Sequence, residues 1–141
     1  MQRCVEMIRI TSPGVLGTLL LFCLVLIGGC EGSHDSQAAQ QIALQYMKQV
    51  QAGDLDQAVK FYPEDTRRNW REFLRQAQEK NGPIRSYKFT NTEVNTVYSG
   101  RYFLFTVDVE YAKTSTTDYL TLFKGVSDDR LFIVSHKITT D

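Results

Sequence analysis

The stretch RYFLFTVDVEY, residues 101–111, alternates apolar and polar side chains and decides the fold. Its apolar positions are Phe103, Phe105, Val107, Val109 and Tyr111. The residues between them include Thr106, Asp108 and Glu110, which would face the other way. A period of two over this length is typical of a β-strand with one buried face. The stretch therefore predicts one strand of a sheet that needs a covering layer on one side.

Similar patterns occur before and after this strand. Residues 87–98 precede it across a turn at 99–100, and residues 118–124 and 131–138 follow it. Because the connections are short, neighbouring strands must run antiparallel. These segments predict a four-stranded antiparallel meander.

Ahead of the first strand, apolar side chains recur at intervals of three and four, as in amphipathic helices. Residues 38–52 predict a long first helix that ends at Gly53, and Asp54 is placed to cap a short second helix. The apolar face of the first helix consists of Ile42, Ala43, Tyr46, Met47 and Val50. Residues 65–80 predict a third helix. Its apolar stripe consists of Trp70, Phe73, Leu74 and Ala77.

The other face of this third helix carries several arginines. They are Arg67, Arg68, Arg71 and Arg75. Their acidic neighbours Glu64, Asp65 and Glu72 favour a solvated, salt-bridged face over a phosphate site. The helices can cover one face of the sheet. The sequence thus predicts an α+β fold, with three N-terminal helices packed on a curved, cone-like, four-stranded antiparallel sheet.

The segment ALQYMKQVQAGDLDQA, residues 43–58, indicates a family. A helix, then Gly-Asp, then a second helix that begins with an aliphatic residue resembles the nuclear-transport-factor-2-like superfamily, also called the cystatin-like cone. In particular, the segment looks like small bacterial lipoprotein domains of unknown function in that group. The resemblance covers residues 38–139 and implies a sheet curved around the long first helix. It implies little about activity, because one fold hosts many functions.

Composition narrows the classes of function. The chain has 141 residues, which is room for one domain. Its 16 basic and 16 acidic side chains give a net charge of zero, so nothing indicates a nucleic-acid partner. The sequence contains no phosphate-binding loop, dinucleotide fingerprint or zinc spacing, and we expect no metal and no cofactor.

The start of the chain has the features of an export signal. Arg3 and Arg9 give a positive beginning, and the run 15–27 carries no charge. As a helix this run would span about 20 Å. That is shorter than the ~30 Å hydrocarbon core of a bilayer and typical of a signal peptide.

The junction Ile27-Gly28-Gly29-Cys30 resembles the lipobox of bacterial lipoproteins, which is an aliphatic residue, two small residues and a cysteine. The resemblance implies that the Cys30 thiol takes a diacylglycerol, that the chain is cut before Cys30, and that the new amino terminus is acylated. Two or three acyl chains anchor a protein stably. An uncleaved signal anchor or a secreted protein with a free thiol are the alternatives. The expected parts are a signal peptide at 1–29, a lipidated cysteine and polar tether at 30–37, and the cone-like domain at 38–141.

The residue after the cysteine indicates a location. In enteric bacteria an Asp there indicates retention at the inner membrane, so Glu31 favours the outer membrane, facing the periplasm. Cys4 and Cys23 lie in the leader, so cleavage would leave Cys30 as the sole cysteine and no disulfide.

Candidates for chemistry are few. His136 is the one histidine of the predicted domain, since His34 lies in the tether. Enzymes of the superfamily that this chain resembles use Asp-His or paired-carboxylate arrangements, which implies His136 with Asp108 as an acid–base pair. The alternation places Asp108 on the opposite face, which argues for a structural histidine instead. Large aromatic side chains would line a pocket or fill the core. They are Trp70, Phe103 and Phe105.

These features predict a lipid-anchored envelope protein whose domain binds a small ligand or an envelope protein without catalysis. Its expected partners are the membrane, through lipid on Cys30, and that ligand or protein. Two alternatives remain open. One is a small dehydratase, isomerase or hydrolase that uses His136 with a carboxylate. The other is a structural or assembly role as a homodimer formed through the sheet.

Overall fold

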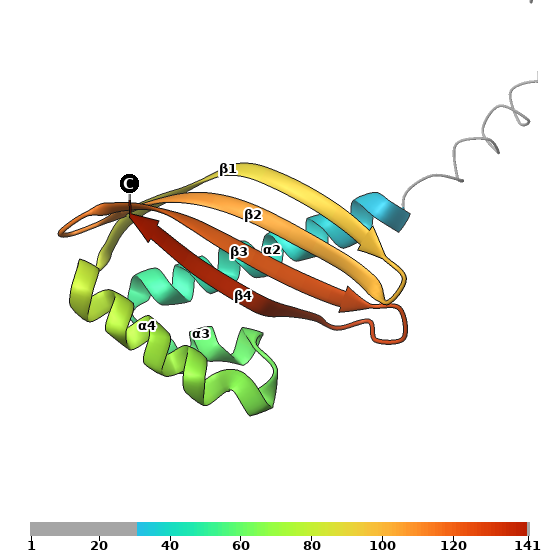
Figure 1. Cartoon of the computed structure of the whole chain (residues 1–141), viewed down its shortest axis with the longest axis horizontal. Coiled ribbons are helices and arrows are strands. Elements are labelled where there is room, and N and C mark those ends of the chain that lie inside the picture. The colour runs from blue at the N-terminus through green and yellow to red at the C-terminus, as the bar shows by residue number, and fades with distance from the viewer. Residues whose placement is uncertain (1–30, 141) are drawn as a thin grey trace, which may run out of the picture. The chain divides into compact units, whose positions relative to one another are not determined.

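Four strands form one antiparallel sheet in a computed structural model that describes residues 31–140 (Figure 1). The strands lie side by side in chain order: β1 (Ile84–Val97), β2 (Gly100–Tyr111), β3 (Ser115–Gly125) and β4 (Leu131–Thr140). The helices precede them in the chain, so the predicted α+β class and order are confirmed. The lipobox prediction lies outside the described residues. It concerns Ile27, Gly28, Gly29 and Cys30.

The helical layer begins with α2 (Glu31–Ala52), followed by α3 (Leu55–Ala58) and a 3-10 turn, η2 (Val59–Phe61). A second turn, η3 (Glu64–Thr66), leads into α4 (Arg67–Asn81). Gly53 ends α2 with a φ of 75°, a conformation that favours glycine. The Asp54 carboxylate accepts a hydrogen bond of 3.1 Å from the Gln57 backbone N–H, as the sequence predicts.

The beginning of α2 differs from the prediction. The segment expected to be a polar tether is helical from Glu31 onward. Asp35 explains the difference, because its carboxylate accepts hydrogen bonds from Arg101 Nη1 (3.1 Å) and Lys124 Nζ (2.8 Å). These ion pairs join the first turns of the helix to β2 and β3. The tether is thus corrected to an ordered, sheet-bound helix start, in which His34 is exposed.

Helices α2, α3 and α4 lie on one side of the sheet (Figure 1), and the core fills the space between the two layers. The inner face of β2 is buried as the alternation predicts: Phe103, Phe105, Val107, Val109 and Tyr111. From the helices come Ala43, Tyr46, Met47, Val50 and Leu74. No helix of residues 31–140 covers the outer face of the sheet, which exposes Leu104, Tyr119 and Val134.

A β-bulge in β4 controls which side chains face the core. Leu122 pairs with Ile133, but its neighbour Thr121 pairs with Ser135, so Val134 is an extra residue. Ile133 and His136 are therefore both buried, although three positions separate them. Strict alternation along residues 131–138 predicts that Val134 lies on the same face as His136. That prediction is wrong, since Val134 is 38% exposed on the outer face.

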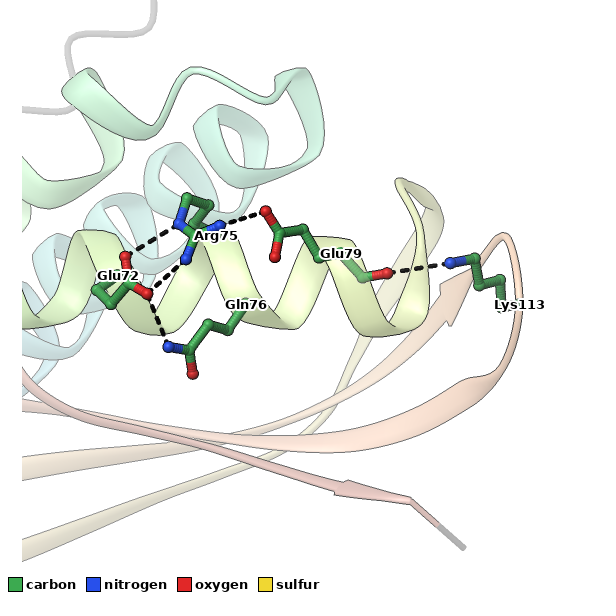
Figure 2. Close-up of polar contacts among 5 residues, drawn as sticks. All are labelled: Glu72, Arg75, Gln76, Glu79 and Lys113. Carbon is green, nitrogen blue, oxygen red and sulfur yellow. Dashed lines mark hydrogen bonds and ion pairs between the residues drawn. The ribbon is translucent and has the colours of Figure 1, made fainter.

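The exposed face of α4 is a network of ion pairs (Figure 2). Arg75 lies between Glu72 and Glu79 and donates hydrogen bonds to both. This guanidinium, with a hydrogen bond from Gln76, lowers the pKa of Glu72 to about 2. Lys113, in the turn after β2, donates a 3.0 Å hydrogen bond to the Glu79 backbone carbonyl. The predicted salt bridge is thus observed between Arg75 and Glu72. Arg71 instead pairs with Asp56, and Arg67 donates to the Tyr62 carbonyl.

Candidate functional site

His136 lies in a buried chain of hydrogen bonds that crosses from the sheet into the helices. Its Nε2 lies 2.9 Å from Asp118 Oδ2 on β3, and its Nδ1 lies 2.7 Å from Tyr46 Oη on α2. Tyr46 Oη is in turn 2.9 Å from Tyr62 Oη, which follows η2. We call Tyr62, Tyr46, His136 and Asp118 the buried polar chain. Four separate parts of the fold supply its members.

Asp118 is the member of the buried polar chain at its sheet end, and its carboxylate accepts further hydrogen bonds. Thr116 Oγ1 donates to its Oδ1 at 2.7 Å, and Tyr111 Oη donates to its Oδ2 at 3.5 Å. Together with His136, three donors surround this carboxyl group. A buried carboxylate needs such donors, because burial without partners is strongly unfavourable.

The partners assign the direction of each hydrogen bond. The Asp118 carboxylate only accepts, so His136 Nε2 carries the hydrogen. In the neutral ring, Nδ1 then accepts from the Tyr46 hydroxyl. The Tyr46 oxygen in turn accepts from Tyr62. Every member of the chain is satisfied in this arrangement, which fixes the histidine tautomer.

Aromatic rings enclose the buried polar chain. The ring of Phe73 on α4 meets the His136 ring edge to face at 5.6 Å, and Trp70 stacks on Tyr62 at 4.5 Å. Burial raises the pKa of Tyr46 well above its usual value and also raises the pKa of Tyr62. Burial and the neighbouring Asp118 raise the pKa of Tyr111. These phenols therefore stay protonated as hydrogen-bond donors near neutral pH.

The arrangement has the parts of an acid–base site but not the access. A histidine oriented by a carboxylate can take up and release a proton if a reacting molecule reaches it. Here the side chains of His136 and Asp118 are each 1% exposed. A substrate has no place beside the ring unless Phe73 moves. The geometry therefore favours a structural role that fixes helices to sheet.

The carboxylate that pairs with His136 is not the predicted Asp108 but Asp118. Asp108 is exposed on the outer face of β2, with β3 between it and β4. Asp118 takes its place because it shares the inner face of β3 with Leu120 and Leu122. The sequence signal for Asp118 is an acidic residue at an apolar position of the strand predicted over 118–124. Tyr46 was predicted to lie in the core and does, but its hydroxyl bridge could not be inferred.

The aromatic residues proposed to line a pocket lie in the packed core or at its edge. Phe103 is fully buried and Phe105 is 1% exposed, while Trp70 is half-buried against Tyr62. A hollow of about 240 Å³ lies elsewhere, between α4 and the end of β4. Its apolar lining residues are Phe73, Ala77 and Ile138, and its polar ones are Gln76, Lys80, Asn81 and Thr140.

Asn81 is the most buried polar residue of this hollow. It is 4% exposed, and its backbone carbonyl accepts a 3.0 Å hydrogen bond from the Lys113 N–H. Its side-chain amide forms no hydrogen bond to any other residue that the structure describes. Lys80, at the rim, forms no ion pair within residues 31–140. The hollow thus combines an apolar floor with an amide and a cation that lack protein partners among these residues.

Within the described part of the chain, no group of three or more His, Cys, Asp or Glu side chains could hold a metal ion. No helix among residues 31–140 is both long and apolar enough to cross a membrane.

Comparison with known proteins shows a likeness of fold to a solved structure. No family model and no curated protein match the chain. The structure of Bdellovibrio bacteriovorus Bd1075 is similar over 79% of this chain, with a TM-score of 0.56 and 12% sequence identity. The aligned region is 43% of that longer chain. At this identity the likeness extends to the fold alone.

Proposed function

We propose that this protein is a lipid-anchored bacterial envelope protein whose domain binds a ligand without catalysis. The junction from Ile27 to Cys30 supports the anchor. The helix-Gly-Asp-helix order and the sheet support membership of the nuclear-transport-factor-2-like superfamily. Glu31 supports the outer membrane, facing the periplasm. Binding is favoured over catalysis because the buried polar chain is closed to solvent, whereas the hollow between α4 and β4 is open.

The observation that carries the binding proposal is the hollow itself, in which the Asn81 amide, bonded to no other described residue, lines the cavity together with apolar side chains. The amide atoms of Asn81 are not closed to solvent, so a ligand in the hollow would replace the water that they bond. Lys80 adds a positive charge at the rim. The hollow is smaller than the roughly 300–1,000 Å³ of pockets for drug-sized ligands. Its chemistry suits a small amphiphile with an apolar body and a carboxylate head.

Titration of short carboxylates tests the ligand class. Hexanoate and benzoate are added to the mature chain carrying Cys30→Ser, and backbone amide shifts are followed by NMR. We expect saturable shifts at residues 76–81 and 138–140, weakened in Lys80→Ala and abolished when Ala77→Phe fills the hollow. Lys60→Ala is the matched control, because Lys60 is exposed away from the hollow and bonded to Gln57. Shifts absent from α4 and β4 would contradict this function.

The anchor has its own test. The intact mass of the protein purified from membranes is compared with that of a Cys30→Ser variant. We expect cleavage before Cys30 and a lipid-sized increment that the variant lacks, together with loss of membrane association. An unmodified Cys30, or a mass that begins at Met1, would remove the anchor from the proposal.

The outer face of the sheet favours a second function, self-association. Tyr102, Phe123 and Phe132 pair across neighbouring strands in one row, and the first two rings lie 4.7 Å apart. Leu104 beside this row is 38% exposed. Apolar side chains in such a row suit a homodimer that packs sheet on sheet. Sedimentation of the Cys30→Ser chain decides it, since a monomer at every concentration, unchanged by Leu104→Glu, would exclude this role.

A catalytic alternative rests on the His136–Asp118 pair. It requires Phe73 to swing away so that a substrate reaches the ring. If it holds, Phe73→Ala should open the ring to a small histidine-reactive reagent such as diethyl pyrocarbonate. Equal protection of His136 in the wild type and in a folded Phe73→Ala variant would exclude the catalytic alternative and leave the buried polar chain with a structural role.

A further inference from the structure

One end of the sheet carries apolar side chains that are exposed. Tyr98, in the turn between β1 and β2, is fully exposed, and Val126, in the loop after β3, is 75% exposed. Val97 beside them is 37% exposed. The two turns adjoin, because the Val126 N–H donates a 3.1 Å hydrogen bond to the Ser99 carbonyl. We call Val97, Tyr98 and Val126 the tip surface.

The beginning of α2 is fastened to this same end of the sheet (Figure 1). Asp35 binds Arg101, the second residue of β2, and Lys124, the last but one of β3. Both strand positions directly adjoin the turns that carry the tip surface. Cys30 precedes Asp35 by five residues, a length that spans at most about 18 Å even when fully extended. A lipid on Cys30 would therefore tether Asp35 within this length of the bilayer.

The acidic side chains at this end are neutralised by neighbours. Asp35 is held by Arg101 and Lys124, while Asp129 lies 3.8 Å from Lys124 and Asp128 lies 3.0 Å from Arg130. Paired acids do not repel an anionic lipid surface as free ones would. Among the exposed side chains at this end are the apolar Val126 and the aromatic Tyr98, beside the exposed Asp129. Tyrosine in particular suits the boundary between headgroups and acyl chains, because its ring is apolar and its hydroxyl is wet.

We propose that the tip surface is the membrane-facing side of the domain, with Tyr98 and Val126 seated at the headgroup boundary of a phospholipid bilayer. This inference rests on the proposed lipidation of Cys30, which brings the end of the sheet to the bilayer. The lipid supplies the affinity, and the tip surface sets the orientation. The hollow between α4 and the far end of β4 then faces away from the membrane. The outer face of the sheet is then roughly perpendicular to the membrane plane.

Site-directed spin labelling in vesicles tests this orientation. The full lipidated protein is reconstituted into phosphatidylethanolamine–phosphatidylglycerol vesicles, with a single label at Tyr98→Cys or Val126→Cys. Lipidation occupies the Cys30 sulfur, so the introduced thiol alone reacts. Matched controls are Tyr119→Cys, an exposed tyrosine of the outer face, and Lys113→Cys, in the turn at the opposite end of the sheet. Collision of each label with lipid-soluble oxygen and with a water-soluble nickel chelate is measured.

We expect labels at 98 and 126 to show a severalfold higher ratio of oxygen to nickel collisions than labels at 113 and 119. The intact mass is recorded for each sample. A lipid mass on Cys30 with four equal, water-like ratios overturns the orientation and leaves the proposed function standing. A lipid-like ratio at 119 instead overturns it in favour of a sheet face on the membrane. A mass without lipid overturns the anchor, and this inference falls with it.

Discussion

The Nε2 atom of His136 lies 2.9 Å from Oδ2 of Asp118, although 18 positions separate the two residues and both are closed to solvent. A buried pair of this kind adds little stability relative to well-packed apolar residues, but removing one partner is strongly destabilising. The pair also joins β3 to the bulged part of β4. Through Tyr46 it fixes α2 over that point. Its main effect is therefore to specify how the helical layer sits on the sheet.

Replacing Asp118 tests this role. In Asp118→Asn, the amide keeps the shape but cannot accept from Thr116, Tyr111 and His136 as the carboxylate does. We expect the free energy of unfolding to fall by about 2–4 kcal/mol, measured by urea denaturation. Asp108→Asn is the control, because Asp108 is exposed on the outer face, and it should change stability by less than about 0.5 kcal/mol. Equal effects of the two variants would refute the assignment.

The Tyr46 hydroxyl is the link between helix and sheet. Tyr46→Phe keeps the ring but leaves Tyr62 Oη and His136 Nδ1 without their shared partner. We expect a loss of about 1–3 kcal/mol in the free energy of unfolding. Tyr87→Phe is the matched control, since the Tyr87 hydroxyl bonds no other described residue. A Tyr46→Phe variant as stable as this control would mean that the bridge contributes nothing.

Stability should fall at high pH because of the three buried tyrosines. The folded state raises the pKa of Tyr46, Tyr62 and Tyr111. The unfolded chain loses these protons near pH 10 while the folded chain keeps them, so unfolding is favoured as the pH rises. Each such tyrosine should lower the free energy of unfolding by about 1.4 kcal/mol per pH unit above roughly pH 10. Urea denaturation between pH 8 and 11.5 measures the slope, and Tyr46→Phe should make it shallower. A flat profile would contradict the burial.

The start of α2 should loosen without Asp35. Asp35→Ala removes the carboxylate that binds Arg101 and Lys124, so amides at 36–40 should exchange hydrogen faster, while those of β3 remain protected. The Lys124 hydrogen bond lowers the pKa of Asp35. The contact should therefore also weaken in the wild type as the pH falls below about 4. Asp56→Ala, which removes an exposed partner of Arg71, is the control. Unchanged exchange at 36–40 would mean that Asp35 does not hold this segment to the sheet, as expected of the predicted polar tether.

The strands and helices follow from local pattern. Alternation in residues 101–111 places five side chains in the core because a strand turns every second residue to the same face. Gly53 and Asp54 end one helix and begin the next through backbone and capping chemistry confined to a few residues. For the same reason, the salt-bridged face of α4 could be predicted from acids and arginines one turn apart.

The candidate site could be predicted only in part. The sequence indicates His136 as a possible acid–base residue, but the superfamily resemblance implied Asp108 as its partner, and periodicity alone does not reveal the pairing register that places Asp118 there instead. The β4 bulge shifts the inward side of the strand by one residue, and no local signal in residues 131–138 indicates it. The tether was mistaken for the same kind of reason, because Asp35 gains its partners from strands 66 and 89 positions away.

The sequence by itself determined the class of fold, the order of its elements and the composition of the core, since hydrophobic periodicity and helix ends are local properties. Only the tertiary structure decided that Asp118 faces His136, that Tyr46 links them to the helices, and that Asn81 lines a hollow between α4 and β4. These are relations between distant segments. They depend on strand register and on how one layer is seated on the other, which packing of the whole domain determines.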